Sequence, residues 1–157
     1  MARYVVGTGF GGTQQAMTTT YKTLAALTAA TGATTLRKAW IYDILFGADG
    51  TPADNALVYK ADRQTSVGTG TSATPSPIDT SDAAALITAT VNHTAEPTGI
   101  GNILIEVPVN QRASYRWVAA PGGELVVPAT NTTGIGFRAK SPTGYTGTVG
   151  CSLHFWE

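Results

Sequence analysis

The stretch Val149-Gly150-Cys151-Ser152-Leu153-His154-Phe155-Trp156 alternates in chemical character along its whole length. The apolar side chains at every second position, from Val149 to Phe155, fall on one face, and Ser152, His154 and Trp156 fall on the other. Successive side chains of a β-strand point to opposite faces of a sheet. The stretch therefore predicts a half-buried strand whose apolar face lies in a core.

The same period of two returns in several other segments, each bounded by residues that favour turns. Residues 103–109, 114–119 and 135–140 alternate in this way, and Pro108 indicates an edge strand because proline cannot donate a ladder hydrogen bond. Between residues 55 and 64 the apolar set is Leu57, Tyr59 and Ala61, and the polar set is Lys60, Asp62 and Gln64. Short strands with a turn about every 8–12 residues are typical of a β-sandwich or barrel. We therefore expect an all-β, antiparallel domain of about eight strands.

The remaining segments give weaker signals. Residues 1–20 are rich in glycine and threonine, and we interpret them as an N-terminal arm or an irregular edge strand ahead of one domain over residues 21–157. Residues 22–31 fit either a short helix or a strand, and residues 65–77 are typical of an exposed loop. Asp79 to Leu86 resembles a capped helical turn. Thr88 to His93 is expected to return to strand.

Charge and composition exclude several classes of function. Charged residues make up 13% of the chain, against roughly 25% in typical globular domains, and ten basic residues balance ten acidic ones. No basic run exists that would neutralise phosphates, so no nucleic-acid partner is expected. No segment approaches the about 18 apolar residues of a membrane span, and the start lacks an apolar stretch of signal-peptide length. We expect synthesis in a cytoplasm and no contact with a membrane.

Motifs for cofactors and metals are weak. Residues 7–12 match the dinucleotide fingerprint G-x-G-x-x-G, but the following residues are poor helix formers and the first acidic residue of the chain is Asp43. The two histidines, His93 and His154, are far apart, and Cys151 is predicted to face the core while His154 faces outward. The Asp49 to Asp54 turn lacks the dense carboxylates of a calcium loop. We predict no cofactor and no metal.

Catalysis is not predicted either. No G-x-S-x-G nucleophile elbow is present. A carboxylate pair for glycoside hydrolysis would have to come from Asp43, Asp62, Glu106 or Glu124. Asp62 and Glu106 are predicted to point to solvent. The sequence therefore favours a protein that is not an enzyme.

Outward-facing arginine and tryptophan side chains are the more informative features. Trp156 lies off the predicted core face. Arg116 stands between Tyr115 and Trp117 on the outward face of its predicted strand, and Arg112 lies just before that strand. Exposed Trp and Arg are enriched in interface hot spots. The alternative is that the arginines pair locally with carboxylates and Trp156 covers one end of the sandwich. As candidate interface residues we take Arg3, Tyr4, Phe10, Arg112, Arg116, His154 and Trp156.

Several segments together resemble a family of small proteins encoded in the structural gene clusters of tailed phages. The segments are residues 42–55, 63–65, 92–98, 110–124 and 138–142. The resemblance is to jelly-roll decoration, or cement, proteins. It implies a single jelly-roll sandwich that binds the major capsid protein as a homotrimer on the outer surface of the virion, with no catalytic residue and no cofactor.

Two other functions compete with this one. A carbohydrate-binding or adhesin-like sandwich would stack Trp156, Trp117 or Tyr145 on sugar rings, and it needs two or three aromatic side chains on one exposed face. Trp117 is predicted to lie on the core face instead. A cupin-type enzyme needs a histidine cluster, which two distant histidines do not supply.

Overall fold

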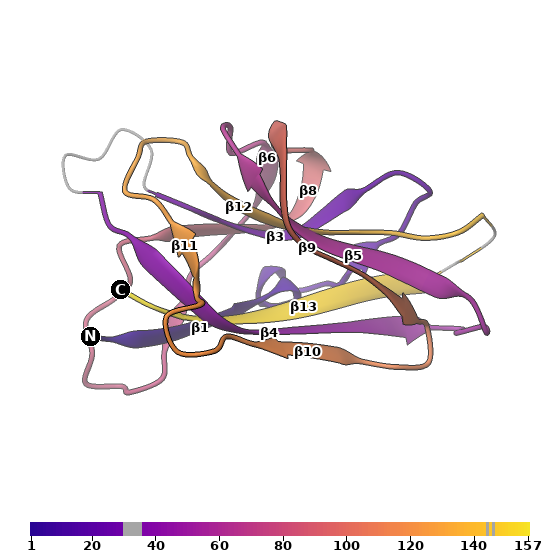
Figure 1. Cartoon of the computed structure of the whole chain (residues 1–157), viewed down its shortest axis with the longest axis horizontal. Coiled ribbons are helices and arrows are strands. Elements are labelled where there is room, and N and C mark those ends of the chain that lie inside the picture. The colour runs from indigo at the N-terminus through magenta and orange to yellow at the C-terminus, as the bar shows by residue number, and fades with distance from the viewer. Residues whose placement is uncertain (30–35, 144, 146) are drawn as a thin grey trace.

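The computed structural model describes residues 1–29, 36–143, 145 and 147–157, and these form two antiparallel sheets packed face to face. In Figure 1 the sheets lie one above the other, with β4, β13 and β10 in the lower layer and β3 and β12 in the upper. The expected all-β antiparallel sandwich is confirmed, and the jelly-roll connectivity stays a prediction. Among the described residues there are thirteen strands rather than about eight, because short strands such as β2, β7 and β11 add to the long ones.

The larger sheet has seven strands. Its order is β10-β4-β13-β1-β7, with β11 paired to β4 and β2 paired to β13. The strands are β1 (Arg3–Gly7), β2 (Gln15–Ala16), β4 (Ala39–Gly50), β7 (Ser76–Pro77), β10 (Tyr115–Val118), β11 (Leu125–Val127) and β13 (Gly147–Trp156).

The smaller sheet has six strands, in the order β6-β8-β3-β12-β5-β9. The strands are β3 (Lys22–Thr28), β5 (Ala56–Gln64), β6 (Thr69–Ala73), β8 (Thr88–Ala95), β9 (Gly99–Asn110) and β12 (Gly134–Lys140). A short 3-10 helix, η1 (Thr8–Gly11), follows β1. β9 lies at the edge of this sheet, as Pro108 predicted.

The core lies between the two sheets and is built from the alternating apolar positions. Val149, Cys151, Leu153 and Phe155 of β13 are all buried, which confirms the predicted inward face of that strand. Side chains from opposite sheets meet there, as in the pair Phe46 and Tyr59, whose ring centroids are 4.8 Å apart. Burial of this apolar surface is the main force that holds the sheets together.

A β-bulge interrupts the pairing of β4 with β13. His154 pairs with Asp43 and the next residue, Phe155, pairs with Ile41, so Tyr42 is the extra residue on β4. Ile41 and Ile44 on either side are fully buried. Two consecutive β4 residues therefore lie on the outer side of the sheet, which a strict period of two does not allow.

Three segments differ from their sequence-based predictions. Residues 3–7, expected in an arm or irregular edge strand, form β1, which pairs with β13 on one side and β7 on the other. Residues 65–77 contain β6 and β7 instead of being one exposed loop. Asp79 caps a turn and not a helix, because its Oδ1 accepts hydrogen bonds from the backbone N–H and the hydroxyl of Ser81.

The two segments left uncertain by sequence are both strands. Of residues 22–31, those from Lys22 to Thr28 form β3, and residues 30 and 31 lie outside the described residues. Residues 88–93 belong to β8. Threonine and the other β-branched side chains suit the pleated surfaces of these strands.

The polar face of β5 is buried, which corrects the prediction that Asp62 and Gln64 lie on a solvent-exposed face. Asp62 is 2% exposed and Gln64 is 1% exposed. Arg138 of β12 lies 2.9 Å from the Asp62 carboxylate and also donates to the carbonyl of Pro97, so the chain after β8 covers this side of the sheet. Within the described residues, no helix has the length and apolar character needed to cross a membrane.

Candidate binding surfaces

The bulge in β4 creates a row of outward side chains on the seven-stranded sheet. Tyr42 and Asp43 both lie on the outer side, opposite His154 of β13, and the rings of Tyr42 and His154 meet edge to face at 6.1 Å. One step along, Trp40 pairs with Trp156. We call the row the outer strip, and it consists of Arg3, Trp40, Tyr42, Asp43, Arg116, His154 and Trp156.

The two tryptophans of the outer strip stack on one another. Their ring centroids are 4.9 Å apart and their planes differ by 17°. Both side chains are only partly buried, and Arg3 of β1 pairs with Trp156 in the sheet. A shallow depression bounded by Met1, Arg3, Tyr42 and Trp156 lies beside the stack. Partly exposed aromatic side chains, Tyr42 and Trp156, therefore border a depression at this end of the strip.

Arg116 and Asp43 form an ion pair in the middle of the outer strip. The Arg116 Nε lies 3.0 Å from Oδ1 of Asp43, and its Nη2 lies 2.6 Å from Oδ2. These hydrogen bonds from Arg116 hold the pKa of the Asp43 carboxyl below its usual value. The carboxylate is buried, whereas the arginine side chain is 62% exposed. Arg116 therefore keeps part of its guanidinium open to a ligand.

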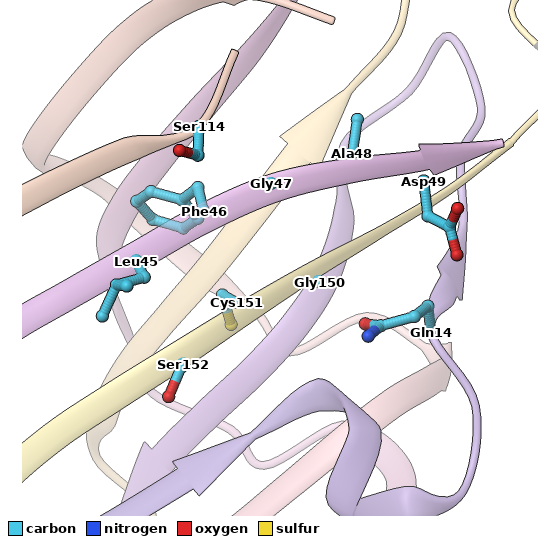
Figure 2. Close-up of a pocket in the computed structure, with 10 residues that line it drawn as sticks. All are labelled: Gln14, Leu45, Phe46, Gly47, Ala48, Asp49, Ser114, Gly150, Cys151 and Ser152. Atoms are coloured by element: carbon cyan, nitrogen blue, oxygen red, sulfur yellow. The ribbon is translucent and has the colours of Figure 1, made fainter. Parts of the chain in front are cut away.

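A hollow opens further along the same two strands (Figure 2). Gly47 of β4 pairs with Gly150 of β13, and the side chain of Gln14 lies over Gly150, so the open part of the hollow is the surface above Gly47. Figure 2 shows Asp49 and Gln14 at one end of the hollow and Ser114 and Ser152 at the other. Above Gly47 the space is open, since a Cβ placed there would have no neighbour within 4 Å.

The polar side chains around the hollow are available for intermolecular contacts. In the described part of the chain, the side chains of Gln14, Ser114 and Ser152 form no hydrogen bond. The Asp49 carboxylate accepts one hydrogen bond, from the backbone N–H of Gly50 at 2.7 Å. An amide, two hydroxyls and a carboxylate thus surround the open surface above Gly47.

The structure brings four of the seven candidate interface residues together and separates the others. Arg3, Arg116, His154 and Trp156 belong to the outer strip. Tyr4 is 2% exposed, packs on Phe155 and donates to the carbonyl of Ala83, so it belongs to the core. Phe10 lies on η1 and is 48% exposed, and Arg112 pairs with Asp54 at 3.3 Å in a loop.

Sequence reasoning missed Trp40 and Tyr42 as members of the outer strip. They lie in an apolar run whose period is broken by the bulge, so the run alone does not indicate which side chains face outward. The signal that was available is the pair Tyr42-Asp43: two polar-tipped residues between buried isoleucines fit a bulge better than a regular strand.

Buried and partly buried charges gather on the outer side of the six-stranded sheet. Glu96 accepts hydrogen bonds from the backbone N–H and the hydroxyl of Thr23 and lies 2.8 Å from the Lys22 ammonium. Lys60 lies 2.8 Å from Asp62, which also faces Arg138. Each carboxylate is therefore matched by a cation, an arrangement typical of a structural network.

His93 lies buried near this network. It is 2% exposed, and its Nε2 shares a hydrogen bond of 3.0 Å with the hydroxyl of Thr90. Burial lowers the pKa of His93, which opposes protonation in the folded protein. None of the five described depressions of the surface is lined by His93.

The remaining metal and thiol candidates do not converge. Asp49 and Asp54 are engaged by Gly50 and Arg112 respectively. Among the described residues no three His, Cys, Asp or Glu side chains group as metal ligands. Cys151 is 6% exposed, and burial raises the pKa of its thiol to about 12. That thiol is a packed core group beside Thr8, and it is not a reactive nucleophile.

The edge strand β9 is the second exposed apolar feature. Residues 99–105, Gly-Ile-Gly-Asn-Ile-Leu-Ile, carry no charge. Ile100 is 48% exposed and Ile103 is 50% exposed, although the alternation predicted Ile103 on the inner face. Register shifts in the pairing of β5 with β9 on either side of Asp62 explain this difference.

Comparison with known proteins adds no family to this description. No family model, no curated protein and no solved structure matches the chain. The geometry on its own defines a β-sandwich with exposed aromatic and apolar side chains in the outer strip beside its hollow and along the β9 edge.

Proposed function

We propose that the chain is a structural virion protein that decorates the outer surface of a tailed-phage head as a homotrimer, with the major capsid protein as its partner. It acts by binding and carries out no reaction, and it uses no cofactor. The proposal rests on the resemblance of most of residues 36–157 to phage structural proteins and on a sandwich with exposed surfaces suited to binding. The jelly-roll connectivity belongs to the same proposal.

The β9 edge is the observation that carries the proposal. The strand is 12 residues long and ends the six-stranded sheet, so its outer backbone groups have no partner strand among the described residues. Its first seven residues are uncharged, and two isoleucines stand half exposed there. Soluble proteins usually protect such edges with charges or proline. Here Pro108 protects only the second half of the strand.

A neighbouring chain is the natural cover for this edge. The net charge of the protein is zero, so copies do not repel one another strongly. On a capsid lattice, many modest contacts of this kind add up to tight binding. We therefore assign the β9 edge to the contact between copies within the trimer.

Light scattering after size-exclusion chromatography tests the proposal, first on the natural chain and then on a double variant, Ile100→Lys with Ile103→Lys. The natural chain is expected at three times the 16.2 kDa chain mass, and the double variant as a monomer. The control is Leu86→Lys, because Leu86 is 47% exposed and lies outside the strands. The natural chain should cosediment with phage heads stripped of their decoration protein, and the double variant should cosediment less. A control that dissociates as fully as the double variant would argue against the β9 edge.

A further inference from the structure

The structure carries a second adhesive surface that the contact between copies does not use. We propose that the outer strip and the hollow together form a binding groove for a neutral, extended oligosaccharide. This activity goes beyond the proposed structural role and does not depend on it. The groove lies along β4 and β13, whereas the edge assigned to the trimer is β9 of the other sheet.

The aromatic end of the groove provides partly exposed aromatic side chains at the protein exterior. Trp40, Tyr42 and Trp156 all lie on one outer face and are all partly exposed, which meets the requirement that a sugar-binding sandwich present two or three aromatic side chains together. Sugar rings have apolar C–H faces that pack on such rings, with polar edges left for hydrogen bonds. The stacked tryptophans are held by each other, so little side-chain freedom is lost on binding.

The other end of the groove provides the hydrogen-bonding groups. Gln14, Ser114 and Ser152 have side chains without a partner in the described structure, and they border the open surface above Gly47. Sugar hydroxyls both donate and accept, which suits an amide and hydroxyls. The absence of a side chain on Gly47 lets a ligand approach the backbone there.

The balance of charge selects a neutral ligand. The groove carries two arginines, Arg3 and Arg116, and two carboxylates, Asp43 and Asp49. Their formal charges cancel. A nucleic acid or a polyanionic glycan needs an excess of basic residues, which this face does not have.

The length of the groove selects an extended ligand. Gly150 and Trp156 are six residues apart on β13, which corresponds to roughly 20 Å along a strand. Arg116 and Asp43 lie between the two ends, together with the 37% exposed Leu45, so one apolar side chain interrupts the polar groups. A monosaccharide would contact only one end.

Binding to a panel of neutral cello-, xylo-, malto- and chito-oligosaccharides, printed as an array and then measured by calorimetry, tests the proposal. Two variants act on opposite ends of the groove. Trp156→Ala removes half of the tryptophan stack, and Gly47→Val places a side chain in the hollow, where a Cβ meets nothing within 4 Å. Phe10→Ala is the matched control, because Phe10 is an exposed aromatic residue outside the groove.

The proposal predicts that at least one neutral series binds, that longer members bind more tightly than the monosaccharide, and that each groove variant weakens binding about tenfold or more. Phe10→Ala should bind as the natural chain does. No binding to any member of the panel at millimolar concentration overturns the proposal. Unchanged affinity in Gly47→Val also overturns it. If the groove variants lose binding to phage heads while no sugar binds, the outer strip is a protein-docking surface and the proposal is wrong. A monomeric chain that binds sugar would leave this inference intact and contradict the proposed structural role.

Discussion

The guanidinium of Arg116 on β10 and the carboxylate of Asp43 on β4 face each other in a fork, with donor–acceptor distances of 3.0 and 2.6 Å. β10 is the edge strand of its sheet, so this pair ties an otherwise weakly held strand to the long strand beside it. It also fixes one guanidinium edge and leaves the rest exposed. Arg116, which the sequence indicated as a candidate interface residue, therefore both stabilises β10 and keeps part of its guanidinium at the surface.

Acid should weaken this pair in a predictable way. The Arg116 hydrogen bonds lower the pKa of Asp43 in the folded protein, so the ionised carboxylate contributes stability above its unfolded value of about 3.9. That contribution is lost as the pH falls through the lowered folded value. Denaturant titrations between pH 7 and 2 should therefore show the natural chain more stable than Asp43→Asn near neutrality, with a gap that closes in acid. Two curves that stay parallel over the whole range would contradict this account.

His93 should give a second pH dependence at a higher pH. Burial lowers its folded pKa below the unfolded value of about 6.5, so neutral His93 favours the folded state above that pH. As the pH falls toward the folded value, the unfolded chain binds a proton first and stability drops by at most about 1.4 kcal/mol per pH unit. The carboxylate of Glu96 opposes the effect and Arg138 adds to it.

His93→Gln tests this pH dependence, because a glutamine keeps a polar partner for Thr90 without titrating. The free energy of unfolding of the variant should lack the slope just below pH 6.5. A natural chain with no slope in that range would show that His93 protonates freely in the fold.

The alternation of apolar and polar residues predicted the fold because one face of each sheet is buried in the core. It placed Leu153, Phe155 and Tyr59 correctly in the core. It was wrong for Asp62 and Gln64, because a polar side chain between apolar ones normally indicates solvent, and here the chain from Pro97 to Gly99 lies over that face. Sequence patterns do not show which polar face a distant loop will cover.

The candidate site was predictable only in part, for a similar reason. Trp156 and His154 followed from the alternation of β13, and they lie on the outer strip. Their partners Trp40 and Tyr42 depend on a bulge and on the pairing of strands more than 100 residues apart in sequence, which one strand's pattern does not contain. Tyr4 was misplaced because residues 1–20 were interpreted as an arm or irregular edge strand, whereas β1 is paired on both sides.

Substitution by alanine should change the free energy of unfolding differently at two strand glycines. A Cβ at Gly134 of β12 would press on the carbonyl oxygen of Leu27 in the neighbouring strand, whereas one at Gly47 meets nothing within 4 Å. Gly134→Ala should therefore lower the free energy of unfolding by about 1–3 kcal/mol. Gly47→Ala should leave it within about 0.5 kcal/mol or raise it slightly. Urea denaturation of both variants provides the measurement, and equal losses would mean that the close approach at Gly134 is absent.

The Cys151 thiol should be unreactive until the sandwich opens. It is 6% exposed, with its pKa raised to about 12 by burial, so almost no thiolate is present at neutral pH. Its reaction with a disulfide reagent, followed by absorbance, should be slow in buffer and complete within mixing time in strong guanidinium. Fast labelling in buffer would place β13 at the surface and contradict the packing of the core.

The mass of the chain in solution tests the central claim most directly, since the proposed role requires several copies acting together. Light scattering at micromolar concentration should give three times the 16.2 kDa chain mass, and lysines at Ile100 and Ile103 should reduce it to one. A natural chain that stays strictly monomeric at that concentration would contradict the assignment of the β9 edge and, with it, the proposed decoration of a phage head.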